Sequence, residues 1–272
     1  QPETLPLDRG RSLFLLRIPF AIRARLTQLR EAIEGTHPDV VIAHAPQINV
    51  PTLLAMRDRS CPVIVTEHGD VPIRPSLAKP WLWRKWAWYQ LPRRYYPRAR
   101  KVVSVSAAID RNLSWLPQAQ RAIIHNPFAP VDTSSDATLC HAGVLADKNW
   151  IVTMGRLTRT KGHDILLEAF GSIARRFPAW QLLVMGDGEL RGSLEQQAAP
   201  LGGQVVFTGA IREPFALLKR AELFVMASRY EGFPMAHGEA LLCGLPLIAT
   251  DCPSRPGASN GGLRELIRHG LK

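Results

Sequence analysis

The sequence predicts an α/β protein built on parallel sheets, and three observations support this class. Short continuous apolar runs, such as residues 39–43 and 181–185, are typical of parallel strands covered on both faces. Segments of helical length with one apolar stripe separate these runs. Turns rich in glycine follow several of the runs. Alternation of this kind indicates parallel sheets with right-handed crossovers.

The first half of the chain contains four predicted strands, over residues 39–43, 62–66, 102–106 and 121–125. Helices are expected over residues 48–59 and 107–113. An earlier helix over residues 13–34, broken or kinked near Pro19, places one apolar stripe on Ile22, Leu26, Leu29 and Ile33. His68 follows the second strand. Because ligands of open α/β sheets bind outside the carboxyl ends of strands, His68 is a candidate site residue, with an ordinary loop histidine as the alternative.

The second half repeats the alternation. Strands are predicted over residues 150–154, 181–185, 204–208, 223–226 and 247–250, and helices after residues 162 and 189 and over 214–220, 235–243 and 263–268. The helix after Gly162 places one face on Leu166, Phe170, Ile173 and Phe177. The stretch before this half lacks helical periodicity and contains turn residues. We therefore expect domains at residues 1–130 and 149–272, joined by a linker at 131–148.

The positive charge of the chain is concentrated in one segment. The formal net charge is +11, and residues 79–101 hold eight Lys and Arg and no acidic residue, interleaved with aromatic rings. This composition is typical of an interfacial helix on an anionic membrane. Packing of the rings on their own domain is the main alternative, and a nucleic-acid stacking surface is the least favoured. The membrane-surface candidates are Trp81, Trp83, Arg84, Lys85, Trp86, Trp88, Arg93 and Arg94.

Other classes of protein find little support in the composition. The four cysteines show no metal-ligand spacing, and buried free thiols in a reducing compartment are expected. No apolar run approaches the about 20 residues of a membrane span. No signal peptide opens the chain, although its first residue is Gln1 rather than an initiator methionine.

The stretch at residues 229–251 carries the strongest functional signal. Glu231 and Glu239 flank the start of the helix predicted at residue 235, and Pro234 suits a first helical position. The free N–H groups at that end favour an anion such as a diphosphate. Two acceptors beside an anion site suit a sugar nucleotide, which has both hydroxyls and a diphosphate. Two solvated glutamates beside an ordinary turn are the alternative.

A second candidate site lies in the turn at residues 155–162. Its glycines let the backbone approach a ligand, while Arg156 and Lys161 supply positive charge for phosphates. The spacing matches neither a G-x-G-x-x-G nor a Walker loop, so the turn alone is a weak signal.

Taken together, these motifs resemble those of family 4 glycosyltransferases, the retaining group with the GT-B fold. The resemblance is carried by Gly155-Arg-Leu with Lys161-Gly, by Gly186-Asp-Gly, by Gly209 after a strand, and by Ser228-Arg-Tyr-Glu-Gly-Phe-Pro running to Glu239. Cys243-Gly-Leu-Pro and Ala249-Thr-Asp-Cys-Pro extend it. The match covers residues 148–254 well and the first half more loosely, through Thr66-Glu-His, Val105-Ser and His125-Asn-Pro.

The resemblance implies two Rossmann-like domains and transfer of a sugar from a nucleotide-sugar to an acceptor hydroxyl with retention. It implies catalytic roles for His68, Arg156, Lys161 and Glu231, with Arg156 and Lys161 on the diphosphate and Glu231 on the transferred sugar. Glu239 would hold the ribose. The implied donor-binding residues are Gly155, Arg156, Lys161, Gly186, Gly188, Gly209, Glu231, Gly232, Phe233, Pro234, Met235 and Glu239. The resemblance also implies an enzyme that needs no metal ion. In agreement with this, no Asp-x-Asp motif occurs in this sequence. No cofactor is expected.

Two features depart from the family pattern. His237 and Gly238 stand where the family usually has aliphatic residues, and residues 254–262 form a longer, glycine-rich stretch. We also expect the chain to be shortened at both ends, because the family's first strand and glycine-rich loop, and its closing helices, have no counterpart in the sequence.

The leading hypothesis is therefore a cytoplasmic retaining glycosyltransferase, of hexosyl or N-acetylhexosaminyl type, at the inner membrane face. Its acceptor would be an envelope polysaccharide, a lipopolysaccharide or a lipid-linked glycan. The alternatives are a nucleotide-sugar epimerase or soluble synthase of the same fold, and a non-catalytic fragment that binds donor or membrane. Nucleic acid is an unlikely partner.

Overall fold

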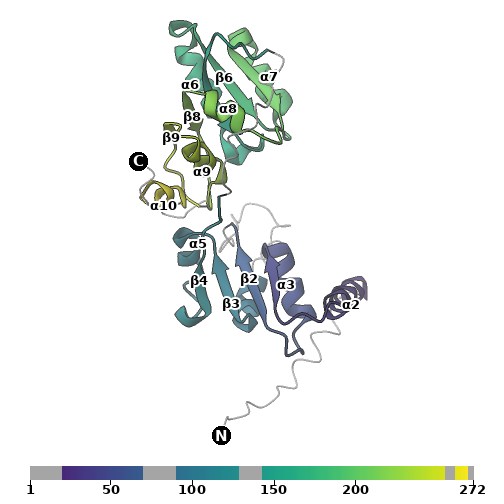
Figure 1. Cartoon of the computed structure of the whole chain (residues 1–272). Helices are drawn as coiled ribbons and strands as arrows, with labels where there is room; N and C mark the ends of the chain where they lie inside the picture. Colours follow the sequence, from purple (N-terminus) through teal and green to yellow (C-terminus); the bar gives the residue numbers. More distant parts are fainter. Residues whose placement is uncertain (1–19, 70–89, 129–142, 255–260, 269–272) are drawn as a thin grey trace. The chain divides into compact units, whose positions relative to one another are not determined.

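The computed structural model describes residues 20–69, 90–128, 143–254 and 261–268. Contacts divide the chain into two compact units (Figure 1). The first comprises residues 1–67, 71–103 and 113–122, and the second comprises residues 68–70, 104–112 and 123–272. We describe each unit by itself. The predicted domain limits at residues 130 and 149 stay a prediction, and most of the predicted linker lies outside the described residues.

The first sheet has four strands in the order β1-β2-β3-β4. They cover β1 (Val41–His44), β2 (Val63–Glu67), β3 (Lys101–Ser104) and β4 (Arg121–Ile123). β1 and β2 pair in parallel, with Val41 opposite Val63. The helices of this half of the chain are α2 (Phe20–Glu34), α3 (Pro46–Ala55) and α5 (Ala107–Asn112), of which α5 belongs to the second unit. All four strands and both short helices predicted for the first half are thus confirmed to within a few residues.

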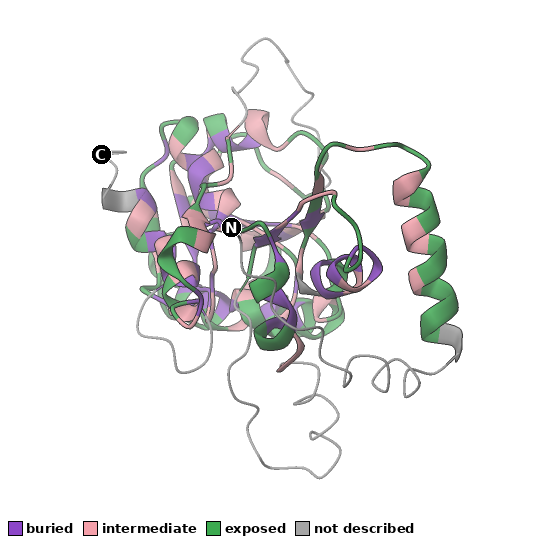
Figure 2. Cartoon of the chain, turned by 90° about the horizontal axis from the view of Figure 1, so that it is seen from below, coloured by how far each residue is buried: buried purple, intermediate pink, exposed green. Residues whose placement is uncertain are grey.

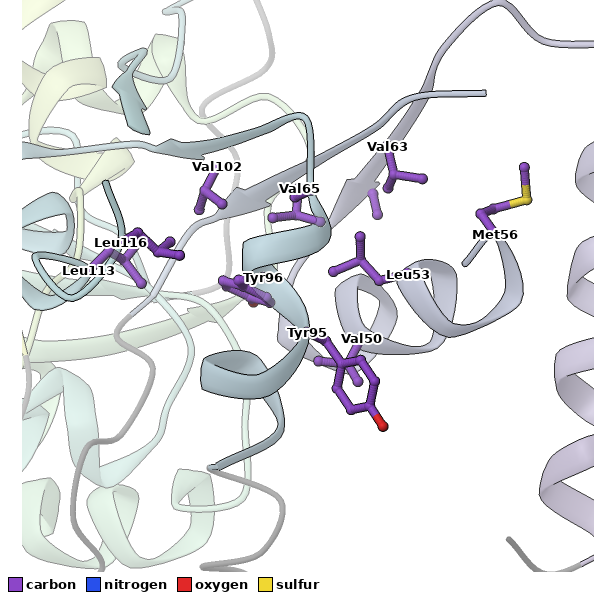
Figure 3. Close-up of a cluster of buried hydrophobic side chains, with 12 residues drawn as sticks. Val50, Leu53, Met56, Val63, Val65, Tyr95, Tyr96, Val102, Leu113 and Leu116 are labelled. Atoms are coloured by element: carbon purple, nitrogen blue, oxygen red, sulfur yellow. The ribbon is translucent and has the colours of Figure 1, made fainter. Parts of the chain in front are cut away.

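The core of the first unit lies between the sheet and the segments around α3 and Tyr96. Figure 3 shows Leu53 of α3 facing Val63 and Val65 of β2, and Val50 of α3 belongs to the same cluster. Burying apolar side chains of this size stabilises the fold by about 1.5–3 kcal/mol each. Along α2, Leu26, Leu29 and Ile33 are half-buried and Ile22 is 46% exposed, so the predicted apolar stripe is covered over part of its length (Figure 2).

A polar cluster closes the carboxyl end of β2. Glu67, Asn49 and Tyr96 are all fully buried. The Tyr96 hydroxyl donates to Glu67 Oε1, and Asn49 Nδ2 donates to the same oxygen at 3.0 Å. Asn49 Nδ2 also donates to the Thr66 carbonyl at 2.9 Å. Buried polar groups are costly when unpaired, so this network ties α3, β2 and the Tyr96 segment together.

The expectation that residues 39–43 are covered on both faces is wrong. β1 is an edge strand, and its Ile42 is 53% exposed while Ala43 is buried. An apolar run predicts extended backbone, but it does not show whether other elements cover both faces of the strand.

The second sheet has five parallel strands in the order β7-β6-β5-β8-β9. They cover β5 (Asn149–Met154), β6 (Trp180–Met185), β7 (Val205–Gly209), β8 (Leu223–Met226) and β9 (Leu247–Ala249). The helices are α6 (His163–Ile173), α7 (Arg191–Ala198), α8 (Phe215–Arg220), α9 (Met235–Leu242) and α10 (Leu263–Arg268). The predicted alternation of strand and helix is confirmed throughout this unit.

Two apolar cores cover the two faces of the second sheet. One gathers around Trp150, Phe224 and Leu218, and the other around Leu167, Phe170 and Leu182. Two expectations are wrong here, namely that the apolar face of the helix after Gly162 is buried as far as Phe177 and that residues 247–250 form a buried strand. Ile173 and Phe177 are 38% and 43% exposed, because the chain leaves α-helical geometry after Ile173 and its short 3₁₀ turn presents Ala174 to the core instead. β9 is an edge strand, and its Ile248 is 58% exposed.

Candidate functional site

The site is built at one edge of the second sheet. β5, β6, β7 and β8 run parallel, so their carboxyl ends meet at the same edge, where open α/β sheets bind ligands. Gly155, Gly186 and Gly209 mark the ends of β5, β6 and β7. The Gly186 N–H donates to the Gly209 carbonyl at 2.8 Å, and the Gly155 N–H donates to the Met185 carbonyl at 3.0 Å. Three of the predicted donor-binding glycines therefore lie side by side.

Two glycines in these turns have no room for a side chain. Gly186 has φ +136°, and a Cβ built on it would overlap the carbonyl oxygen of Gly155. Gly162 has φ +65°, and its Cβ would overlap the carbonyl oxygen of Ala227. Left-handed backbone and close approach both require glycine. Gly188 packs in the same way against the backbone of Leu157.

Lys161 and Glu231 meet at this edge although they lie 70 positions apart in the sequence. Lys161 Nζ lies 2.7 Å from Glu231 Oε1. Ser228 Oγ donates to the same Oε1, also at 2.7 Å. The Ser228 carbonyl in turn accepts the Thr250 hydroxyl at 2.5 Å. A lysine ion pair and a buried hydroxyl thus hold one carboxylate oxygen of Glu231.

The second oxygen of Glu231 stands apart from this network. No hydrogen bond from any residue in the described part of the chain reaches Glu231 Oε2. The Glu231 side chain is only 8% exposed, so the carboxylate is held in a largely desolvated position. The arrangement leaves one acceptor oxygen for a ligand hydroxyl.

The side chains of Arg156 and Glu239 make no hydrogen bond or ion pair with any residue that the structure describes. The Arg156 side chain is exposed, and within the described ranges it makes no hydrogen bond or ion pair. Glu239 is half-buried on α9, and burial raises the pKa of its carboxyl above the ordinary value. Arg156 is therefore available for an anion, and Glu239 for a ligand hydroxyl.

The start of α9 carries the remaining predicted donor residues. Pro234 stands at the N-cap position in an extended conformation, and Met235 opens the helix. Phe233 stacks on the ring of His125, with centroids 5.2 Å apart and planes 9° apart, and on Phe128 at 6.0 Å. This packing fixes the backbone just before the helix, whose free N–H groups suit an anion.

His68 approaches this region through its backbone. A Cβ built on Gly232 would lie 2.9 Å from the His68 carbonyl oxygen, so the two segments are in close contact. The His68 side chain is exposed.

The structure also shows contacts at the site for residues to which the sequence analysis assigned no role. Ser228 and Thr250 lie behind Glu231, and Arg229 pairs with Asp164 beside the Lys161 turn. The three-residue spacing between Ser228 and Glu231 is the one local signal among these contacts. The others join residues at least 22 positions apart, which no local pattern reveals.

Most of the membrane-surface candidates lie outside the described residues, namely Trp81, Trp83, Arg84, Lys85, Trp86 and Trp88. Arg93 and Arg94 are described and exposed. The Arg93 guanidinium lies 5.7 Å from the centroid of the Trp115 ring. Among the helices that the structure describes, none is long and apolar enough to cross a membrane. No three His, Cys, Asp or Glu side chains in the described ranges gather into a group that could hold a metal ion.

Comparison with known families matches both halves of the chain. The model of Glycosyltransferase Family 4 matches residues 3–131, and that of Glycosyl transferases group 1 matches residues 148–271. The chain belongs to glycosyltransferase family 4. The predicted resemblance is thereby confirmed.

Individual glycosyltransferases match this chain over part of its length. An uncharacterised glycosyltransferase of Methanocaldococcus jannaschii is 35% identical over 118 residues, which is 43% of this chain and 29% of the relative. A longer match, 26% identical over 215 residues, covers 78% of this chain and 55% of an N-acetylgalactosaminyltransferase of Campylobacter jejuni. Its name specifies an undecaprenol-linked acceptor. The chain thus spans about a third to a half of the length of these relatives.

Solved structures establish the fold. The HepE structure from Anabaena in complex with UDP and glucose superposes with a TM-score of 0.68 at 22% identity, covering 92% of this chain and 65% of that one. The chain therefore has the GT-B fold with two parallel-sheet α/β units, as predicted.

Proposed function

We propose that this chain is the donor-binding part of a retaining glycosyltransferase that moves a sugar from a nucleotide-sugar to an acceptor hydroxyl. The observation that carries the proposal is the 2.7 Å pair of Lys161 and Glu231 at the ligand-binding edge of the sheet, beside the start of α9. A cation and a carboxylate placed together beside a helix N-terminus match the two halves of a nucleotide-sugar, its diphosphate and its hydroxyls. The UDP and glucose bound to HepE support this chemical class of ligand.

In the reaction, the bond between the anomeric carbon and the diphosphate oxygen breaks, and its electron pair leaves with the diphosphate. Lys161, Arg156 and the N–H groups at the start of α9 stabilise that negative charge. The acceptor oxygen forms the new bond on the same face of the sugar and passes its proton to the departing diphosphate oxygen. Preorganised charge of this kind is usually the largest contribution to catalysis.

The remaining residues orient the donor. Glu231 Oε2 accepts a hydroxyl of the transferred sugar, and Glu239 accepts the ribose hydroxyls. His68 acts near the donor sugar. Lys161 and Arg156 supply the charge that a divalent cation supplies in other transferases, so we propose that the reaction needs no metal ion. Chelation with EDTA should then leave the rate unchanged.

The acceptor is proposed to be a glycan of the cell envelope or a lipid-linked glycan, with the protein on the cytoplasmic face of the membrane. The undecaprenol-linked acceptor of the Campylobacter relative supports this class. The basic segment at residues 79–101, whose Arg93 and Arg94 are exposed, would contact anionic lipid. Replacement of Arg84, Lys85, Arg93 and Arg94 with alanine should abolish co-sedimentation with anionic liposomes; wild-type protein that does not sediment would contradict the membrane contact.

The chemistry is tested in two steps. A thermal-shift screen of UDP-, GDP- and ADP-sugars identifies the donor, because a ligand that binds the folded state raises the melting temperature. Transfer rates are then measured for Glu231→Gln, Lys161→Ala and His68→Ala, with Glu195→Gln on the exposed face of α7 as the control. Loss of one preorganised charge should lower the rate about 100-fold or more. Unchanged rates in all three variants would overturn the proposal, and donor binding without turnover would indicate a binding module.

A further inference from the structure

Arg229 makes its contacts with the turn that carries Lys161. Its guanidinium NH1 and NH2 donate to the two oxygens of Asp164, both at 2.7 Å, in a bidentate pair. NH1 also donates to the Arg159 carbonyl at 3.0 Å. All three bonds therefore end on residues 159–164, which flank Lys161.

The backbone reinforces the same junction. The Arg229 N–H donates to the Thr160 carbonyl at 2.8 Å. Gly162 lies so close to Ala227 that no side chain fits between them. The two segments that carry Lys161 and Glu231 are thus joined by backbone contacts and by the Asp164–Arg229 pair.

Arg229 and Arg156 differ in whether a carboxylate of the protein balances their charge. The Arg229 guanidinium holds the pKa of the Asp164 carboxyl below its ordinary value, mainly through their hydrogen bonds. The positive charge of Arg229 is therefore balanced inside the protein. Arg156, by contrast, is exposed and makes no ion pair within the described ranges.

We propose that the Asp164–Arg229 pair positions Lys161 against Glu231 and does not itself touch substrate. The pair fixes the turn on one side of the Lys161–Glu231 contact to the loop on the other side. Its effect on sugar transfer rests on the proposed function, whereas its effect on the geometry of Lys161 does not.

The geometry is tested without any ligand. The full chain is treated with limiting acetic anhydride, and the acetylation of Lys161 is measured by mass spectrometry relative to the exposed Lys219 of the same sample. The ion pair with Glu231 should protect Lys161 in the wild type, and Asp164→Ala should raise its relative reactivity severalfold. The matched control is Asp251→Ala, which removes another bidentate Arg–Asp pair, with Arg264, that makes no hydrogen bond to residues 159–164 within the described ranges. Unchanged Lys161 reactivity in Asp164→Ala would overturn the proposal.

Exchange of the two charges separates the ion pair from a general loss of stability. The double variant Asp164→Arg with Arg229→Asp should return most of the Lys161 protection, while either single variant should not. Failure of the exchange to do so would show that the pair has no positioning role.

The kinetic consequence is read with UDP-glucose and UDP. Asp164→Ala should lower kcat for transfer by about 10- to 100-fold, because small displacements of positioned groups have effects of this size. Binding of UDP, which lacks the transferred sugar that Glu231 contacts, should weaken much less. Altered Lys161 reactivity in a protein that neither binds nor transfers UDP-glucose would contradict a UDP-sugar donor and keep the positioning role. Altered reactivity with undiminished transfer would contradict the positioning role in catalysis.

Discussion

The ring of Phe128 fills the space that a side chain at position 238 would occupy. A Cβ built on Gly238 would overlap the Cε1 and Cζ atoms of Phe128. The same ring stacks on Phe233, which precedes α9. The glycine at this position, where family 4 usually has an aliphatic residue, thus accommodates a large neighbouring ring.

The effect of Gly238→Ala on the free energy of unfolding should therefore have opposite signs with Phe and with Ala at position 128. In a free helix the substitution stabilises by about 1 kcal/mol, because alanine has the higher helix propensity. In the wild-type background the overlap with Phe128 should outweigh this stabilisation and lower the free energy of unfolding by about 1–3 kcal/mol. In a Phe128→Ala background the same substitution should stabilise. Urea unfolding of the four proteins measures both effects, and an equal effect in both backgrounds would contradict the packing.

The elements of the second unit could be predicted from the sequence because strand, turn and helix each have a local pattern. Lys161 and Glu231 could be named because they lie in motifs of consecutive residues. Exposure of Ile42 and Ile248 could not be predicted, since an apolar run does not show that its strand lies at a sheet edge. The Asp164–Arg229 pair joins residues 65 positions apart, and Phe128 meets Gly238 across 110. Such contacts follow from the tertiary fold.

The Tyr96 hydroxyl should contribute to stability through Glu67. Burial and the Glu67 carboxylate raise the pKa of this hydroxyl, so it remains a hydrogen-bond donor at neutral pH. Tyr96→Phe removes this donor from the buried Glu67 Oε1, which keeps the hydrogen bond from Asn49. We expect a loss of about 1–3 kcal/mol in the free energy of unfolding, measured with urea.

Tyr95→Phe provides the matched control. Tyr95 is buried like Tyr96, but its hydroxyl points away from the Tyr96 ring (Figure 3). Its loss should change stability by less than half as much as the loss of the Tyr96 hydroxyl. Equal losses would show that the hydrogen bond from the Tyr96 hydroxyl to Glu67 makes no special contribution to stability.

Glu265 should act as a cap for the first turn of α5. Its Oε2 accepts the Ala107 N–H at 2.8 Å, and its Oε1 accepts the Ala108 N–H at 3.0 Å. Loss of a capping side chain costs about 0.5–2 kcal/mol. Glu265→Ala should therefore lower stability by that amount and speed hydrogen exchange at the two amides. The exposed Glu222 is the control position, and unchanged exchange in Glu265→Ala would contradict the cap.

His237 should make the protein less stable in acid. It is almost completely buried on α9, with its ring edge against Phe224, and burial lowers its pKa from 6.5 to about 4. As pH falls, the unfolded chain therefore takes up the proton first. The contribution of the neutral ring is complete above pH 6.5 and is lost as pH falls toward 4. The pKa difference corresponds to about 3 kcal/mol of unfolding free energy.

His237→Leu places an aliphatic side chain at this position and should remove this part of the pH dependence. Unfolding free energies of both proteins are measured at pH 7 and at pH 4. The loss between the two pH values should be about 3 kcal/mol smaller in the variant. Other groups, including His163, whose pKa burial also lowers, contribute equally to both proteins and cancel in the comparison. Parallel stability curves for the two proteins would show that His237 is protonated at the same pH in the folded and unfolded states.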